Sequence, residues 1–165
     1  MKRFLLQVWR LLPVWLQVIL SRIIRPSFRV FVAAVMLDQD KRIFLVKQTY
    51  QRFHPWGIPG GGLDHGELPE NGVIREVLEE TGLTVAVEKP LLIKTWAPDK
   101  LAIYYLCRIE DGVFHPTDEV SEYGYFSLAA LPDIRPTDTG LLHQLYEIIG
   151  SYEYELAGSI SRSGR

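Results

Sequence analysis

The chain has 165 residues, a length that suits one domain with a substantial hydrophobic core. Hydrophobic residues make up 47% and charged residues 23% of the sequence, so the composition is that of a globular protein and excludes wholesale disorder. The net charge of −2 is unevenly distributed, because residues 1–37 contain six basic and no acidic residues, whereas the remainder holds 12 basic and all 20 acidic residues. An acidic body of this kind argues against a nucleic acid as partner. The single cysteine excludes an internal disulfide and fits a reducing, cytoplasmic location.

Residues 1–26 predict an amphipathic helical extension. One narrow stripe of this helix is almost wholly polar and carries Arg3, Gln7, Arg10, Val14, Gln17, Ser21 and Arg25. The opposite side is apolar and carries Phe4, Leu5, Val8, Leu12, Trp15, Leu16, Ile19 and Ile23. Pro13 should kink the helix or start a second one. A signal peptide is not expected, because Arg10 and Pro13 interrupt the apolar run.

This extension has three interpretations. It packs on its own domain or on a second copy in a homodimer, it lies on an anionic membrane surface as a peripheral contact, or it spans a membrane. Four polar side chains weigh against the span, namely Gln7, Arg10, Gln17 and Arg22.

The next segments predict two strands and a glycine-rich turn. Residues 28–37 and 43–48 are rich in Val, Ile and Phe and are typical of strands, joined as a hairpin by the turn residues 38–42. Residues 49–56 form a polar and aromatic loop. Residues 59–62, with the sequence PGGG, should not continue a regular element, because proline lacks an N–H and glycine frees the backbone.

A helix is predicted over residues 69–81. Pro69 suits its first turn, and Gly82 suits the position just beyond its end. Its apolar positions recur at helical spacing and should form a buried face made of Val73, Ile74, Val77 and Leu78.

The rest of the chain predicts strands over 84–96, 101–109 and 123–128 and a second helix over 139–152. The apolar stripe of that helix consists of Leu141, Leu142, Leu145, Ile148 and Ile149. The order of elements predicts an α/β protein in which helices cover the faces of a mixed sheet. We divide the chain into the extension (1–26), the domain (27–155) and a polar tail (156–165).

The first helix concentrates acidic residues on one face. Glu76, Glu79 and Glu80 are three or four positions apart, so their like charges repel one another unless a cation offsets them. Mg²⁺ and Mn²⁺ prefer oxygen ligands, so the three carboxylates form a candidate metal site. Arg75 lies beside them in sequence and can pair with a carboxylate to hold it in place.

Three glycines precede this helix. Gly60, Gly61 and Gly62 have no side chains, so a ligand can approach their backbone. Their N–H groups can meet phosphate and their carbonyls can meet a metal. Gly61 and Gly62 are therefore candidate substrate-binding residues, and a metal cluster beside such donors suits phosphoryl chemistry.

The complete arrangement resembles the Nudix box, G-x5-E-x7-R-E-U-x-E-E-x-G-U, in which U is a bulky aliphatic residue. The chain matches every specified position, with Gly61, Glu67, Arg75, Glu76, Val77, Glu79, Glu80, Gly82 and Leu83. It is therefore similar to the Nudix hydrolase superfamily over residues 28–150. The resemblance implies an α/β/α sandwich with a mixed sheet. It also implies Mg²⁺-dependent hydrolysis, with Mn²⁺ as the alternative ion, of a nucleoside diphosphate linked to another moiety X.

The resemblance also implies roles for individual residues. The metal ligands would be Glu76, Glu79, Glu80 and the backbone carbonyl of Gly60. Arg75 would orient this cluster, and Glu67 would support its edge.

Members of the family often carry a further acidic residue on the loop before the last strand. Residues 117–128 offer Glu119 and Glu122 in that context. Glu119 is the first candidate, as an extra ligand or the general base, and Glu122 is the next, as a metal ligand. Family members differ in which glutamate acts as base, so Glu79, Glu80 and Glu119 all stay open.

The substrate is less well defined. The aromatic residues that could stack a base are Phe53, Trp56, Trp96, Tyr104 and Tyr105. Phe53 and Trp56, on the loop before the glycines, are preferred, because the others fit core or half-buried sheet positions. Pro98 lies near the position where a proline marks ADP-ribose pyrophosphatases, although a turn between strands would also accommodate it. We expect a substrate such as ADP-ribose. The alternatives are a (d)NTP pyrophosphohydrolase and a catalytically silent nucleotide-binding module, while isoprenyl diphosphate isomerases normally show an altered box.

Overall fold

The computed structural model describes residues 7, 9–24 and 27–163 of the chain. Its elements in chain order are α2 (Val14–Ile24), β1 (Arg29–Val35), β2 (Ile43–Gln48), β3 (Trp56–Gly57), β4 (Gly60–Gly62), α3 (Pro69–Thr81), β5 (Leu83–Ala97), β6 (Lys100–Gly112), β7 (Val120–Phe126) and α4 (Pro136–Ser163). From residue 27 onward, this order agrees with the predicted one, except that the short strands β3 and β4 precede α3. Helix α4 is longer than predicted at both ends.

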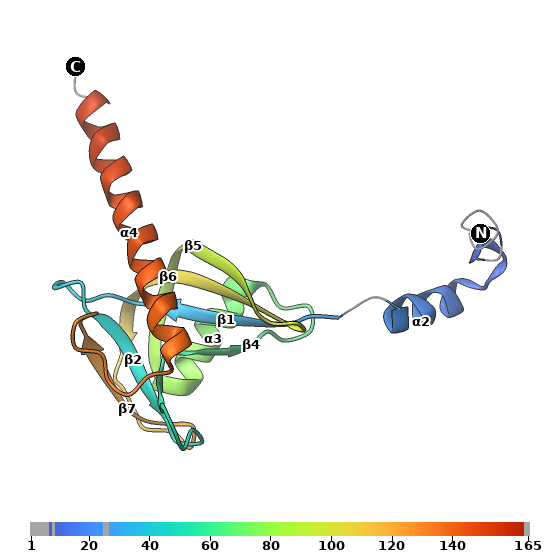
Figure 1. Cartoon of the computed structure of the whole chain (residues 1–165), viewed down its shortest axis with the longest axis horizontal. Helices are drawn as coiled ribbons and strands as arrows, with labels where there is room; N and C mark the ends of the chain where they lie inside the picture. Colours follow the sequence, from blue (N-terminus) through green and yellow to red (C-terminus); the bar gives the residue numbers. More distant parts are fainter. Residues whose placement is uncertain (1–6, 8, 25–26, 164–165) are drawn as a thin grey trace.

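The strands form two sheets, shown in Figure 1. The four-stranded sheet has the order β4-β1-β6-β5. Strand β1 runs parallel to β6 and antiparallel to β4, and β5 runs antiparallel to β6. This sheet is therefore mixed, as the sequence predicts. The second sheet has three antiparallel strands in the order β3-β2-β7.

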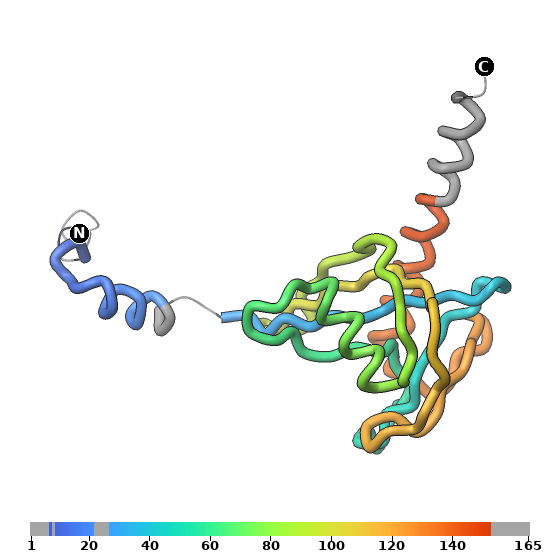
Figure 2. Tube along the Cα trace, turned by 180° about the vertical axis from the view of Figure 1, so that it is seen from behind, coloured from blue at the N-terminus to red at the C-terminus, as the bar shows by residue number. Residues whose placement is uncertain are grey.

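Helices α3 and α4 cover opposite faces of the four-stranded sheet, with α4 in front of it in Figure 1 and α3 in front of it in Figure 2. Side chains of β1 alternate between these faces. Val32 and Ala34 pack in one core cluster with Val73 and Val77 of α3. Val35 belongs to a second cluster, to which α4 contributes Leu141, Leu142, Leu145 and Ile149. The predicted α/β/α sandwich is confirmed.

The connection between β1 and β2 differs from the predicted hairpin. The two chain segments share a bridge between Leu37 and Ile43, and the Phe44 N–H donates to the Met36 carbonyl at 2.9 Å. Beyond this point they separate, because β1 pairs with β4 and β6 while β2 pairs with β3 and β7. The hairpin prediction is therefore right for the turn and wrong for the strands.

Residues 60–62 form a strand, although the sequence predicts irregular structure there. They pair antiparallel with residues 31–33 of β1. Gly60 has a φ of 149°, and a Cβ at this position would lie 2.1 Å from the Val32 carbonyl oxygen. Because glycine has no Cβ, β4 can approach β1 closely, so here the glycines permit a strand rather than end one.

Helix α3 begins and ends as predicted. Pro69 is its first residue, and Gly82 caps its end with a φ of 75° while its N–H donates to the Leu78 carbonyl. The predicted buried face is correct for Val73, which is fully buried, but wrong for Leu78, which is 49% exposed. The helix therefore rests on the sheet along a narrower face than the apolar pattern predicts.

Helix α2 begins directly after Pro13, so this proline starts a second helix, one of the two predicted outcomes. Residues 7 and 9–11, which precede the break, are also helical. Within the described residues, no helix combines the length and the apolar character needed to cross a membrane.

Candidate active site

Glu80 lies where α3 meets β4. This residue is only 4% exposed, and the Gly60 N–H donates to its Oε2 at 2.8 Å. Burial raises the pKa of Glu80 to about 8, the Gly60 N–H opposes this rise, and the carboxylates of Glu76 and Glu119 add to it. Among the described residues, no hydrogen bond holds the other carboxylate oxygen of Glu80, which therefore remains an acceptor for a ligand.

Glu76 lies one turn earlier on α3 and contacts Gly61. A Cβ at Gly61 would lie 2.2 Å from the Glu76 Oε2, so glycine allows this carboxylate to lie against the backbone of β4. Burial raises the pKa of Glu76, and the hydrogen bond from Arg75 opposes the rise. Glu76 and Glu80 thus place two partly desolvated carboxylates beside Gly60 and Gly61.

Arg75 connects the acidic residues of this region. Its Nε and Nη2 donate to the two carboxylate oxygens of Glu67 at 2.9 and 3.0 Å, which makes a bidentate pair. Its Nη1 donates to Glu76 at 2.8 Å and to Glu79 at 3.2 Å, and its Nη2 also donates to the Gly62 carbonyl at 3.0 Å. One guanidinium therefore offsets the repulsion among three carboxylates and ties α3 to β4. Glu79 is the outermost of them, with its side chain 59% exposed.

The two acidic residues before the last strand lie in different surroundings. Glu119 is exposed, and it is close enough to Glu76 and Glu80 that its charge raises the pKa of both. Glu122 instead forms an ion pair with Lys47 on the neighbouring strand β2. The structure thus brings Glu119 toward the cluster and engages Glu122 elsewhere.

Tyr50 is a neighbour of the cluster that sequence reasoning missed. Partial burial raises its pKa, and the charges of Glu80 and Glu119 raise it further. The loop is fixed there because the Thr49 N–H donates to the Glu119 carbonyl at 2.8 Å. No local signal marks Tyr50, since the contact joins loops that are far apart in the sequence.

The cluster fits a divalent cation by its chemistry. Glu76, Glu80 and the backbone carbonyls of β4 offer oxygen ligands only, which hard cations prefer. Among the described residues, no three acidic, histidine or cysteine side chains converge closely enough to hold a metal ion. Arg75 donates hydrogen bonds to Glu76 and Glu79, so either residue would have to exchange an Arg75 contact for the ion.

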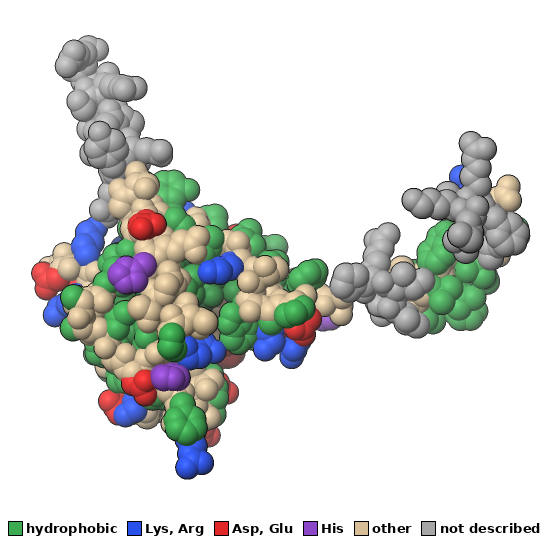
Figure 3. Space-filling model, in the orientation of Figure 1, with side chains coloured by type: hydrophobic (Ala, Val, Ile, Leu, Met, Phe, Trp, Pro, Cys, Tyr) green, Lys and Arg blue, Asp and Glu red, His purple; other side chains and the backbone are tan. Residues whose placement is uncertain are grey.

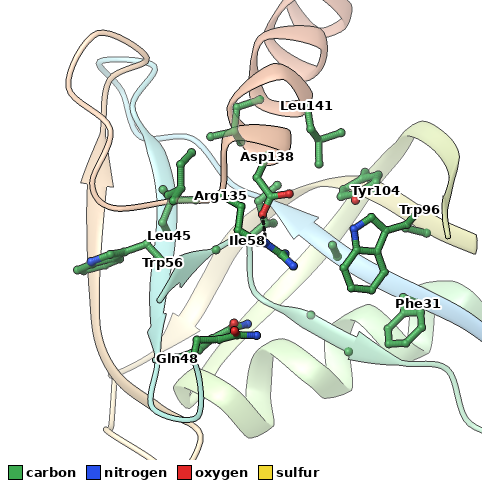
Figure 4. A pocket seen from close by; sticks show the side chains of 18 of the residues that line it. Phe31, Leu45, Gln48, Trp56, Ile58, Trp96, Tyr104, Arg135, Asp138 and Leu141 are labelled. Carbon is green, nitrogen blue, oxygen red and sulfur yellow. Dashed lines mark hydrogen bonds and ion pairs between the residues drawn. The ribbon is translucent and has the colours of Figure 1, made fainter. Parts of the chain in front are cut away.

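A cavity of about 240 Å³ adjoins Gly60 and Gly61, between the two sheets and the start of α4 (Figure 4). Its polar and aromatic lining includes Gln48, Tyr50, Trp96, Tyr104, Arg135 and Asp138. Arg135 and Asp138 form an ion pair of 2.8 Å, and the guanidinium carbon of Arg135 lies 5.3 Å from the ring centroid of Trp96. Flat aromatic surfaces beside a few polar groups are features of sites that bind small organic ligands.

The two predicted stacking residues lie in different places. Trp56 borders the cavity, but its ring packs edge-on against Phe126 at 5.0 Å and points away from the cavity in Figure 4. Phe53 is 72% exposed and is not among the lining residues. Neither placement favours a stacking role for these rings.

Trp96 and Tyr104, which the sequence assigns to the sheet, do line the cavity. They belong to β5 and β6, and the turn between these strands contains Pro98. The neighbouring Tyr105 points to the other face, where its hydroxyl donates to Glu70 of α3 at 3.1 Å. The alternation of a strand separates Tyr104 from Tyr105, but it does not tell which face holds the cavity.

The comparison with protein families agrees with this fold. The family model described as NUDIX domain matches residues 27–145, which is most of the chain. The chain belongs to the NUDIX domain family.

Individual relatives share part of the sequence. A MutT-like protein of Streptomyces ambofaciens is 34% identical over 57% of this chain and 60% of its own length. An ADP-ribose pyrophosphatase of Methanocaldococcus jannaschii is 31% identical over 60% of this chain and 62% of its own length. The chain thus spans about three fifths of these two relatives.

Solved structures share the fold. A UDP-X diphosphatase has a TM-score of 0.68 at 20% identity, covering 81% of this chain and 70% of that one. An ADP-ribose pyrophosphatase of Streptococcus suis has a TM-score of 0.63 at 27% identity, covering 78% of this chain and 92% of that one.

Proposed function

We propose that the protein is a metal-dependent Nudix hydrolase that cleaves the diphosphate linkage of a nucleoside diphosphate joined to another moiety X, such as ADP-ribose. The observation that carries this proposal is the placement of Glu76 and Glu80 against the backbone of Gly60 and Gly61, directly beside the cavity. Family membership and the ADP-ribose pyrophosphatases among the relatives support it.

The proposed cofactor is Mg²⁺, with Mn²⁺ as the alternative. When bound, the cation would neutralise diphosphate charge and lower the pKa of a water molecule. Glu76, Glu80 and the Gly60 carbonyl are the first candidates for its ligands, because they lie together at the junction of α3 and β4. Glu79 and Glu122 are weaker candidates, since each would have to leave an ion pair to reach the metal.

Three glutamates remain candidates for the general base. Glu80 is almost fully buried, which supports a ligand role. Glu79 is exposed but paired with Arg75. Glu119 combines exposure to water with a charge that raises the pKa of Glu76 and Glu80, so it is the candidate that exposure and electrostatics support best.

The cavity supports a nucleoside-like group as part of the substrate. Gly60 and Gly61 line the cavity, and their backbone also contacts the carboxylates of Glu80 and Glu76. A diphosphate lying over these glycines would therefore reach both the metal ligands and the cavity. Trp96 offers a flat surface for a ring, and Asp138 offers carboxylate oxygens as acceptors.

The proposal is tested by incubating the full chain with ADP-ribose and a panel of nucleoside diphosphate derivatives and (d)NTPs, with Mg²⁺ or with a chelator. We expect metal-dependent release of a nucleoside monophosphate. The Glu80→Gln variant should lose roughly 10²- to 10⁴-fold in kcat. Glu110→Gln is the matched control, because it makes the same chemical change at the surface ion pair with Arg108, and it should retain most of the activity.

Two other outcomes would change the assignment. Release of pyrophosphate from (d)NTPs, without cleavage of ADP-ribose, would make the protein a (d)NTP pyrophosphohydrolase. Nucleotide binding without turnover would make it a catalytically silent module. In the part of the chain that the structure describes, no three acidic, histidine or cysteine side chains converge closely enough to hold a metal ion. The silent module is therefore the second candidate.

The remaining expectations do not depend on this test. A cytoplasmic location, and a homodimer or membrane contact through residues 1–26, stay predictions.

A further inference from the structure

The N-terminal part of the chain carries charge of one sign. Residues 1–37 contain six basic residues and no acidic residue. The last of the six, Arg29, pairs with Asp99 of the body at 2.8 Å, so its charge is already engaged. The other five precede it, and Arg10 among them is exposed. Positive charge without acidic partners in the same segment indicates that the segment binds an anionic surface on a partner.

Helix α2 exposes large apolar side chains. Val18 and Ile19 follow Trp15 by three and four positions and therefore share one side of the helix with it; the three side chains are 45%, 46% and 64% exposed, respectively. Leu11 and Val14 nearby are 84% and 75% exposed. Figure 3 shows hydrophobic side chains over most of the visible described surface of this segment. Exposed apolar surface of this kind marks an interaction site.

The backbone carbonyls beside the helix break at Pro13 find hydrogen-bond donors within the segment. The side-chain amide of Gln17 donates to the carbonyls of Trp9 and Leu12, at 3.1 and 2.8 Å. These carbonyls lie at the break, where proline cannot supply a helical N–H. A segment that enters an apolar environment must satisfy such groups internally, because each unpaired one costs free energy. Gln17 therefore makes this bent segment compatible with burial.

We propose that residues 9–24, here called the docking segment, bind the surface of an anionic phospholipid bilayer and lie in its interface. The exposed apolar side chains would enter the boundary between headgroups and acyl chains, and Arg10 would face anionic headgroups. Pairing with the same segment of a second copy would bring like charges together, whereas an anionic bilayer supplies the opposite charge. This proposal does not depend on hydrolysis by the body of the protein.

Co-sedimentation of the full chain with phosphatidylcholine vesicles, with and without phosphatidylglycerol, tests the proposal. We expect pelleting with the anionic vesicles, weaker pelleting with the neutral ones, and loss of binding as salt rises. Trp15→Ser should weaken binding at least about tenfold, and Arg10→Gln roughly fivefold. The matched controls are Val113→Ser and Arg108→Gln, which alter exposed residues of the body and should bind as wild type does.

A second measurement removes the dependence on variants. Brominated phosphatidylcholine in anionic vesicles should quench tryptophan fluorescence of the wild-type chain, since Trp15 would lie in the interface. Absence of both pelleting and quenching would overturn the proposal. It would also be overturned if, without vesicles, sedimentation velocity gave a dimer that Trp15→Ser dissociates and neither vesicle type bound the chain. The docking segment would then bind a second copy.

Discussion

The two walls of the proposed site are built differently. One wall consists of β4 and α3, which lie within the continuous stretch of residues 60–83, and its charged groups are already joined through Arg75. The other wall surrounds the cavity and is assembled from β1, β2, β5, β6 and the start of α4, which are far apart in the sequence. Aromatic contacts and the pair of Arg135 with Asp138 hold it together.

Because the two walls are built from different segments, the residues for chemistry and those for substrate selectivity can change independently. Substitutions in the cavity wall leave the hydrogen bonds around Arg75 untouched, so the reaction can be kept while the substrate changes. Substitutions in the first wall should instead affect every substrate alike.

The largest expected effect is on the pH dependence of stability, and it comes from Glu80, the buried carboxyl group of the first wall. The pKa of Glu80 is about 8 in the folded chain against an ordinary value of 4.5, so between these values the folded state keeps a proton that the unfolded state has lost. Without metal, the stability that this provides is fully present below about pH 4.5 and is lost as the pH rises to about 8. We expect the free energy of unfolding, measured by urea denaturation with EDTA, to fall by a few kcal/mol from about pH 5 to about pH 8.

Glu80→Gln should remove most of this pH dependence, because glutamine does not titrate. Glu122→Gln should retain it, since Glu122 pairs with Lys47 outside the cluster. Equal slopes in wild type and Glu80→Gln would mean that Glu80 is ionised in the metal-free fold, contrary to the expected effect of its burial.

The next effect concerns Arg75. Arg75→Ala should reduce kcat/KM by about 10- to 100-fold for every substrate, because the residue positions Glu76 and Glu79 through hydrogen bonds. Arg75→Lys keeps the charge and loses the bidentate bond to Glu67, so it should resemble the alanine variant. Steady-state kinetics on two substrates measure both. Wild-type rates in Arg75→Lys would show that the charge alone suffices.

The third effect tests the close approach of β4 to β1. Gly60→Ala should lower the free energy of unfolding by about 1–3 kcal/mol, because the new Cβ would lie 2.1 Å from the Val32 carbonyl oxygen. Gly62→Ala is the matched control, since a Cβ at Gly62 has no neighbour within 4 Å. Urea denaturation compares the two variants. Equal stabilities would show that the strand can shift without cost.

The smallest effect concerns the cavity wall. Trp96 is 47% exposed, so its replacement by alanine should cost about 1 kcal/mol of substrate binding, the low end for a base stacked on an aromatic ring. KM should then rise roughly fivefold while kcat stays nearly constant. Phe53→Ala is the control, because Phe53 lies outside the cavity lining. A larger effect at Phe53 than at Trp96 would restore the stacking role predicted from the sequence.

Sequence reasoning succeeds where the signal is local. The bounds of α3 follow from Pro69 and Gly82, and the three glutamates of the first wall lie on a single helix. A helical period and two end signals are enough to place them on neighbouring turns, but not to predict that Glu80 is buried while Glu79 is exposed. The family resemblance implies Gly60 beside the same cluster through its carbonyl, but it does not predict the hydrogen bond that the Gly60 N–H donates to Glu80.

Sequence reasoning fails where strand pairing or ring direction depends on residues far away in the chain. The departure of β2 from β1 is decided by pairing with β7 and with β6, which lie much later in the chain. The same holds for Trp56 and Trp96, since the direction of each ring depends on which neighbours fill the space around it. The Trp56 ring packs edge-on against Phe126, and the ring centroids of Phe31 and Trp96 lie 6.0 Å apart. No single-segment pattern contains this information.

The bonds of Arg75 to Glu67, Glu76 and Glu79 have a consequence for biosynthesis. Many small metalloproteins cannot fold until their ion arrives, because their clustered ligands repel one another or lack a core. Here an internal cation already pairs with three of the carboxylates, and a separate apolar core holds α3 on the sheet. We expect newly made chains to fold in a cell depleted of divalent metal. Metal scarcity would then suspend the proposed hydrolysis reversibly instead of sending the chain to proteolysis.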